Sequence, residues 1–71
     1  MSTTQLMDRL CQQAKIKELH VGVRLAEDQI TGKQELWLVV RNPRMEKDIV
    51  RQIYDLDDPT HSIQNTLEFL T

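Results

Sequence analysis

Catalytic or metal-binding chemistry would require reactive side chains at suitable spacings, and this sequence offers few. Cys11 lies on the apolar stripe of a predicted helix, where a cysteine behaves as a small hydrophobic residue. His20 and His61 are too far apart in the sequence to suggest a shared metal site. The acidic run at 55–58 lacks the glycine and the terminal glutamate of a calcium loop. We therefore predict no enzyme activity, no cofactor and no metal site.

The stretch ELWLVVRNPR, residues 35–44, instead contains residue types that bind other molecules. In an extended strand, alternate side chains point to opposite faces. One face would carry Leu36, Leu38 and Val40. The other face would carry Trp37 and Val39. A short chain needs one apolar face for its own core, so the second face is the candidate surface for a partner.

The elements before this strand are predicted from their hydrophobic periods. Residues 2–15 have helical spacing, and Ser2 and Gln5 are spaced as a capping box. Residues 18–28 alternate with a period of two, as in a half-buried strand, and Thr31-Gly32 is the expected turn. The expected pairs on the core face are Leu25 with Leu36, Val23 with Leu38 and Val21 with Val40. The expected pairs on the second face are Arg24 with Trp37, Gly22 with Val39 and His20 with Arg41. A register shifted by two residues would keep the same faces and change these partners.

Two further helices are predicted after the hairpin. Asn42 is a favoured N-cap and Pro43 suits the first helical position, so we predict a helix over residues 43–56. Its apolar face would consist of Met45, Ile49, Ile53 and Leu56. Pro59 should end this pattern and start a third helix capped by Asp58. The apolar stripe of that helix would be Ile63, Leu67 and Leu70.

The predicted fold is a single α+β domain, residues 1–71, with the order α-β-β-α-α. A two-stranded antiparallel hairpin would carry its helices mainly on one face, and dimerisation could complete a four-stranded sheet. A chain of this size buries only about 60% of its unfolded surface, so its stability is marginal. The single cysteine rules out an internal disulfide. A homodimer is therefore the expected source of additional stability.

The charge and the hydropathy of the sequence limit where in the cell the protein is expected and which classes of partner it is expected to bind. The net charge is −2. Residues 33–51 carry five basic and three acidic side chains, which sum to +2, and residues 52–71 carry four acidic and no basic ones, which sum to −4. Nucleic-acid-binding domains usually show a stronger basic excess. The sequence has no long apolar run and no secretory signal pattern, so we expect a cytoplasmic protein without a membrane anchor.

Three hypotheses compete for the second face of the hairpin. The helix after Pro59 could fold over Trp37, on its own subunit or swapped to another. The face could bind protein, a second copy or a larger partner, and this hypothesis is favoured because Trp and Arg dominate interface energetics. Its residues would be Trp37, Val39, Arg24, Arg41 and His20.

The face could instead bind single-stranded nucleic acid, by stacking on Trp37 and by phosphate contacts. That alternative would use Arg24 and Arg41, extended by a basic stripe of Arg44, Lys47 and Arg51 on the next predicted helix, with Asp48 beside that stripe. We accordingly predict a small regulatory, adaptor or inhibitor module that binds protein.

Overall fold

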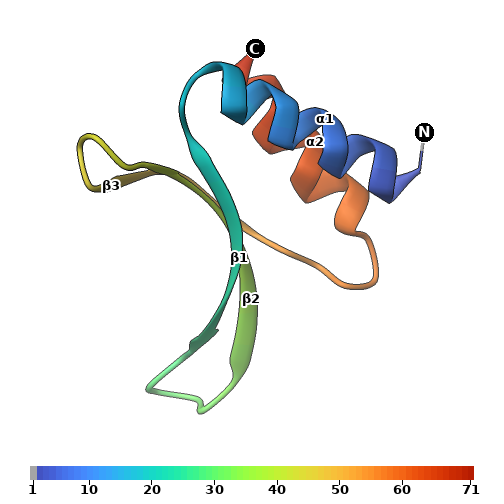
Figure 1. Ribbon diagram of the computed structural model, residues 1–71. Helices are drawn as coiled ribbons and strands as arrows, with labels where there is room; N and C mark the ends of the chain where they lie inside the picture. The colour runs from blue at the N-terminus through green and yellow to red at the C-terminus, as the bar shows by residue number, and fades with distance from the viewer. Residues whose placement is uncertain (1) are drawn as a thin grey trace.

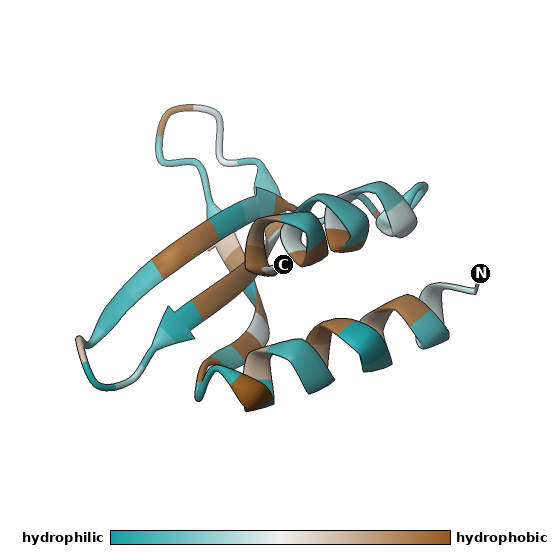
Figure 2. Ribbon diagram, turned by 90° about the horizontal axis from the view of Figure 1, so that it is seen from above, coloured by the Kyte–Doolittle hydropathy of each residue, from teal (hydrophilic) through white to brown (hydrophobic). Residues whose placement is uncertain are grey.

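The computed structural model describes residues 2–71, which form two helices and a three-stranded antiparallel sheet of an α+β domain (Figure 1). The elements are, in chain order, α1 (Thr3–Ile16), β1 (His20–Glu27), β2 (Gln34–Asn42), β3 (Lys47–Ile53) and α2 (Pro59–Leu70). The strands lie in the order β1-β2-β3. Both helices lie on the same side of the sheet (Figures 1 and 2). The turn end of the β1–β2 hairpin extends beyond them.

Helix α1 begins with the predicted capping box. The Ser2 hydroxyl accepts a hydrogen bond from the Gln5 backbone N–H at 3.2 Å, and the Ser2 N–H donates to the Gln5 side chain at 3.1 Å. The helix buries one residue per turn: Leu6, Leu10 and Ala14. Cys11 is exposed, so its predicted burial is wrong. The buried stripe is narrow because it follows the single i, i+4 row that faces the sheet and α2.

The β1–β2 hairpin has the register that the sequence predicts. Val23 lies opposite Leu38, and on the other face Arg24 lies opposite Trp37. At the turn, the Asp28 N–H donates to the Lys33 carbonyl at 2.8 Å. Gly32 has a φ of 70°, a left-handed conformation that glycine adopts at little cost. The alternating apolar pattern determined which side chains face the core, because a one-residue slip would move every core side chain to the other face. The pairing of individual residues is set by the structure.

The predicted helix over residues 43–56 is wrong, because this segment forms a turn and then β3. The Asn42 side-chain oxygen accepts hydrogen bonds from the backbone N–H groups of Arg44, at 3.0 Å, and Met45, at 3.3 Å. Such bonds resemble those of a helix N-cap, but here they close a tight turn. Glu46 then takes a left-handed φ of 52°, which turns the chain back along β2. The pair β2–β3 makes the sheet three-stranded rather than two-stranded.

A β-bulge in β3 explains why its sequence resembles a helix. Arg41 lies opposite Asp48 and Val40 lies opposite Val50, so Ile49 is an extra residue in β3. Val50 is buried in the core and Ile49 packs against it. Two consecutive core-facing residues do not alternate, and the bulge therefore hid the period of two on which strand prediction depends.

Helix α2 begins at Pro59, as predicted, and returns the chain to α1. Asp58 is its N-cap residue, but the predicted cap is wrong: within residues 2–71 the Asp58 side chain makes no capping hydrogen bond. The Ser62 hydroxyl donates to the Ile53 carbonyl and thereby joins α2 to β3. No helix in the described chain is long and apolar enough to cross a membrane.

The core lies between the helices and one face of the sheet. Its buried side chains are Leu6, Leu10, Ala14, Leu38, Val40, Val50, Ile63 and Leu70. Figure 2 shows apolar positions recurring along both helices. Because α2 packs here, it lies on the opposite side of the sheet from Trp37. The hypothesis that this helix folds over Trp37 of its own subunit is therefore wrong, and in the described chain neither helix lies on the Trp37 side.

Candidate functional site

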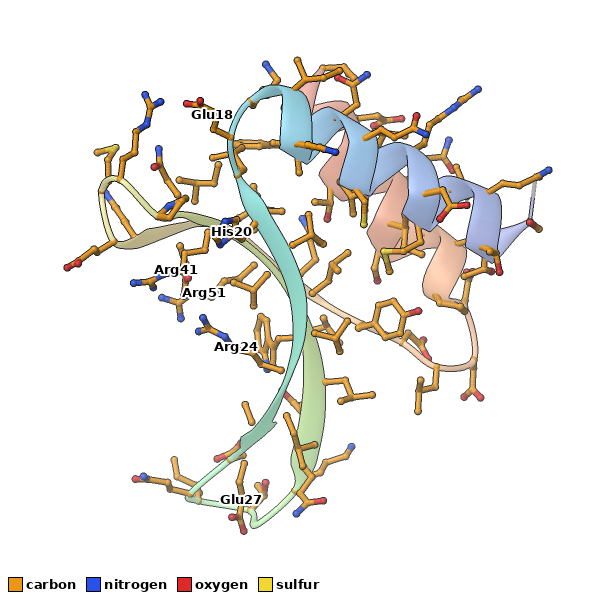
Figure 3. All side chains as sticks on the ribbon, viewed as in Figure 1. Glu18, His20, Arg24, Glu27, Arg41 and Arg51 are labelled. Atoms are coloured by element: carbon orange, nitrogen blue, oxygen red, sulfur yellow. The ribbon has the colours of Figure 1, made fainter. Side chains whose placement is uncertain are left out.

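The candidate site is the sheet face that points away from the helices, here called the outer face. Its side chains come from all three strands: His20, Arg24 and Ala26 of β1, Glu35, Trp37, Val39 and Arg41 of β2, and Asp48, Arg51 and Ile53 of β3. Figure 3 shows the labelled His20, Arg24, Arg41 and Arg51 on the side of the sheet away from the helices. Each residue of the predicted protein interface lies on this face.

The sheet register arranges these side chains in three cross-strand rows. The first row is Arg24, Trp37 and Ile53. The second row is Gly22, Val39 and Arg51. The third row is His20, Arg41 and Asp48. Cross-strand neighbours have Cβ atoms about 5 Å apart. Trp37 therefore has a cationic neighbour on β1, Arg24, and Val39 has one on β3, Arg51.

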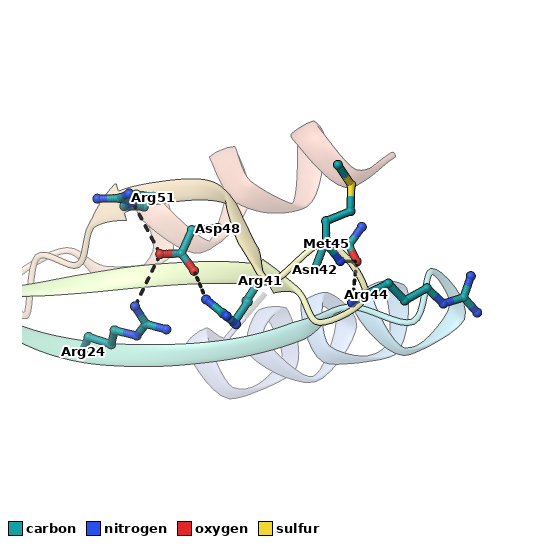
Figure 4. A network of polar contacts seen from close by, with 7 residues as sticks. All are labelled: Arg24, Arg41, Asn42, Arg44, Met45, Asp48 and Arg51. Carbon is teal, nitrogen blue, oxygen red and sulfur yellow. Dashed lines mark hydrogen bonds and ion pairs between the residues drawn. The ribbon is translucent and has the colours of Figure 1, made fainter.

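An aspartate lies at the centre of this basic surface. Asp48 Oδ2 lies 3.4 Å from Arg24 Nη1 and 3.6 Å from Arg51 Nε, and Oδ1 lies 3.5 Å from Arg41 Nη1 (Figure 4). The Asp48 side chain is only 12% exposed, whereas the arginine side chains are 39% to 68% exposed. Asp48 therefore draws three guanidinium groups together at the surface while it remains largely covered by them.

Asp48 and the three arginines around it together carry a charge of +2. Their separations of 3.4 to 3.6 Å exceed those of strong charge-assisted hydrogen bonds, which are about 2.7–2.9 Å. Within residues 2–71, the buried Oδ1 atom of Asp48 accepts no hydrogen bond. Each guanidinium has five N–H donors. Most of these donors are therefore free for a carboxylate or phosphate from another molecule.

A pocket of about 300 Å³ lies among these residues, lined by Arg24, Ala26, Trp37, Val39, Asp48 and Arg51. Its apolar surface comes from Ala26, Trp37 and Val39. Val39 is buried although no described helix covers this face. The methylene stems of long arginine side chains shield apolar surface in this way. The arrangement suits an apolar side chain inside the pocket and acidic groups at its rim.

The predicted basic stripe of Arg44, Lys47 and Arg51 does not exist, because its three residues are not on one helix. Arg44 lies in the turn and its guanidinium pairs with Glu18. Lys47 begins β3 opposite Asn42. Only Arg51 reaches the outer face.

Asp48 was not predicted to belong to the site. In the sequence it is an acidic residue beside the predicted basic stripe. Its place beside Arg41 follows only from the bulged pairing of β3 with β2. No signal in the sequence identifies that bulge directly, although the β-branched Ile49, Val50 and Ile53 favour a strand.

Within the described residues, no group of three or more His, Cys, Asp or Glu side chains is placed to hold a metal ion. Comparison of the chain with protein-family models, with curated proteins and with solved structures gave no significant match. The geometry of the outer face is therefore the basis for any functional proposal.

Proposed function

We propose that this chain is a small protein-binding module of the cytoplasm, not an enzyme, whose outer face binds an acidic segment of another protein. The observation that carries the proposal is the grouping of Arg24, Arg41 and Arg51 around Asp48, beside the pocket at Trp37. A regulatory or adaptor role fits a module with one such face. The exposed thiol of Cys11 fits a reducing compartment.

The partner segment should carry an apolar side chain with carboxylates on both sides of it. A volume of about 300 Å³ admits one large apolar side chain between Trp37 and Val39. Trp and Arg are the residues most enriched among those that dominate binding energy. Carboxylates can accept paired hydrogen bonds from guanidinium groups. The +2 charge of the cluster around Asp48 favours an acidic partner over a basic one.

Binding of single-stranded nucleic acid is the second candidate, supported by the same tryptophan and arginines. Trp37 could stack on one base, and Arg24, Arg41 and Arg51 could contact phosphates. It is less favoured because Arg44 and Lys47 lie outside the outer face, which leaves a short basic surface. Proteins that bind without sequence preference usually present several aromatic platforms along a continuous basic groove.

We also propose that the protein is a homodimer, and the outer face limits how its copies can meet. Stacking two outer faces would bring together six arginines and two copies of Asp48, because each face carries three arginines around one aspartate. Like charges in contact oppose association. Pairing through a sheet edge avoids this repulsion and leaves both Trp37 pockets free for partners.

The acidic-segment proposal can be tested by fluorescence, because Trp37 is the only tryptophan. The probe is the peptide Glu-Glu-Phe-Glu-Glu, and the control is Lys-Lys-Phe-Lys-Lys. We expect a saturable change of Trp37 emission with the acidic peptide alone. The double variant Arg24→Gln with Arg51→Gln should weaken binding at least about tenfold, because it removes two charge-assisted contacts. Equal responses to both peptides, or an unchanged affinity of the variant, would contradict the proposal.

The same assay separates the nucleic-acid alternative. A ten-nucleotide thymidine strand should bind more weakly than the acidic peptide if the proposal is right. If the strand binds more tightly, and if the logarithm of its affinity falls linearly with the logarithm of salt concentration, counterion release identifies nucleic acid as the preferred partner.

A further inference from the structure

The two edges of the sheet, β1 and β3, differ in their protection against pairing with another strand. β3 carries the bulge at Ile49 and the charged residues Lys47, Asp48 and Arg51. β1 also carries charged side chains, Arg24 and Glu27, but it keeps a continuous register with β2 and contains no proline, lysine or bulge among its described residues. Natural sheets use charges, prolines and bulges to prevent unwanted edge pairing. β1 is therefore the edge that is open to another strand.

The helix-facing side of β1 also carries apolar surface without full cover. Val21, at the end of β1 near α1, packs against the core. Val23 is 47% exposed and Leu25 is 63% exposed. The hairpin extends beyond both helices in this region (Figure 1). A strand added at this edge would cover the flanks of these two side chains.

We infer that β1 pairs antiparallel with β1 of a second copy, with Val23 opposite Val23, so that two three-stranded sheets join into one of six strands. The inference rests on the proposed homodimer and is independent of the acidic partner. The interface is isologous, because the same strand supplies both of its sides.

The hydrogen-bonding phase of β1 fits this pairing. The bond from the Asp28 N–H to the Lys33 carbonyl marks these residues as a hydrogen-bonded pair of the hairpin. Such pairs alternate with non-hydrogen-bonded pairs along an antiparallel ladder. Even-numbered residues of β1 therefore direct their backbone groups to β2. Val21, Val23 and Leu25 direct theirs to the open edge, and the inferred register sets Val21 opposite Leu25 of the other copy.

Charge and space favour Val23 over Arg24 as the centre. Pairing centred on Arg24 would set two guanidinium groups directly opposite each other, which is destabilising. Pairing centred on Val23 sets Arg24 opposite Gly22 instead. A Cβ atom added at Gly22 would meet no atom within 4 Å. A hollow of about 120 Å³ lies at this point, lined by His20, Val21, Gly22, Arg24, Val39 and Arg41, and offers room for the stem of the second Arg24.

In the inferred dimer, antiparallel pairing of the two β1 strands also covers the exposed Ile16. It sets the start of each β1 strand beside the end of the other. Helix α1 ends at the exposed Ile16, shortly before β1 begins. Ile16 of one copy therefore lies toward Leu25 of the other, on the helix-bearing side. On the opposite side, the two outer faces become one surface with two Trp37 pockets.

Disulfide formation between mixed variants tests the register. Gly22→Cys and Arg24→Cys are made separately, each with Cys11→Ser, and one is tagged for identification. Residues 22 and 24 form a non-hydrogen-bonded pair in the inferred dimer, with Cα atoms about 4.5 Å apart, a distance that permits a disulfide. We expect the mixed sample in a glutathione redox buffer to yield about tenfold more covalent heterodimer than either covalent homodimer. Covalent homodimers of Arg24→Cys alone would instead place the centre at Arg24 and overturn the register.

Light scattering behind a sizing column separates failure of the register from failure of the dimer. Val23→Lys should raise the dimer dissociation constant at least about 100-fold, because two ammonium groups would face each other. Ile53→Lys is the matched control on the β3 edge, where the native side chain is 54% exposed, and it should leave the dimer intact. A wild-type dimer that Val23→Lys leaves unchanged would overturn pairing through β1 but not the homodimer. A wild-type monomer would overturn both, while peptide binding at Trp37 would stand on its own assay.

Discussion

Replacing Asp48 by asparagine should reveal how strongly the charges of the outer face depend on one carboxylate. The substitution keeps the shape of the side chain and removes the negative charge that lies 3.4 to 3.6 Å from three arginine nitrogens. At such distances one ion pair has a Coulomb energy of about 1 kcal/mol in water and about 5 kcal/mol at an effective dielectric constant of about 20.

Because the arginines are exposed, the energy of each ion pair should lie near the lower of these two values. Their side chains are 39% to 68% exposed, and measured exposed pairs contribute about 0.2–1 kcal/mol each. The contribution of the three pairs is reduced by the cost of covering Asp48 and by repulsion among the arginines. We therefore expect Asp48→Asn to lower the unfolding free energy by about 1–2 kcal/mol. At about 1 M salt the Debye length falls to about 3 Å, so the loss should shrink to less than half.

Urea unfolding followed by Trp37 fluorescence and circular dichroism measures this loss, at equal protein concentrations and at low and high salt. Glu35→Gln is the matched control, because it removes a carboxylate from the same face and no ion pair of Glu35 occurs within residues 2–71. An unchanged or raised stability of Asp48→Asn would refute the assigned role of Asp48. A loss of the same size at all salt concentrations would show that packing, not charge, is responsible.

Asp48→Asn is expected to strengthen peptide binding, although it lowers the stability of the fold. Asp48 competes with an incoming carboxylate for the guanidinium donors of Arg24, Arg41 and Arg51. Its removal should therefore tighten binding of the peptide Glu-Glu-Phe-Glu-Glu about three- to tenfold, as one additional charge-assisted contact would. Weaker binding by a folded Asp48→Asn protein would mean that the grouping of the arginines by Asp48 contributes more to binding than its competition for their donors costs.

Other parts of the fold give further predictions. Leu10→Ala should lower the unfolding free energy by about 2–5 kcal/mol, because Leu10 is fully buried; Phe69→Ala, at an exposed position of α2, should change it by less than about 0.5 kcal/mol in the same urea titration. Asn42→Ala should cost about 1 kcal/mol through loss of two side-chain bonds to the turn, measured by thermal unfolding. Cys11 should react with a thiol reagent in the native protein nearly as fast as in urea, because it is exposed.

The hairpin and the helices at both ends of the chain could be predicted because their patterns are unambiguous. Strict alternation in β1 predicted the side of the sheet on which Arg24 lies, although a register shifted by two residues would have fitted the same pattern. The Ser2–Gln5 capping box marked the start of α1, and Pro59 marked the start of α2. In each case local preference and tertiary packing favour the same structure.

The third strand could not be predicted, because its local signals are those of a helix. Asn42 makes the side-chain bonds of an N-cap, but they close a turn. Ile49 and Ile53 have helical i, i+4 spacing, yet Ile49 occupies a bulge. Pairing with β2 decides the outcome, since it satisfies backbone groups along a strand whose β-branched residues suit a sheet. The site was consequently predicted without Asp48, the residue that groups its arginines.

The bulge at Ile49 also determines which changes of chain length β3 can accept. Asp48 and Arg51 are three residues apart, a spacing that places side chains on opposite faces of a regular strand. They share the outer face because Ile49 adds one residue between the pairs Arg41–Asp48 and Val40–Val50. Deletion of Ile49 would leave a regular strand with both charges still on the outer face. Insertion of a residue beside it would either widen the bulge or turn the Asp48 carboxylate toward the apolar core, where an unpaired charge is costly. This part of the chain should therefore tolerate the loss of one residue better than the gain of one.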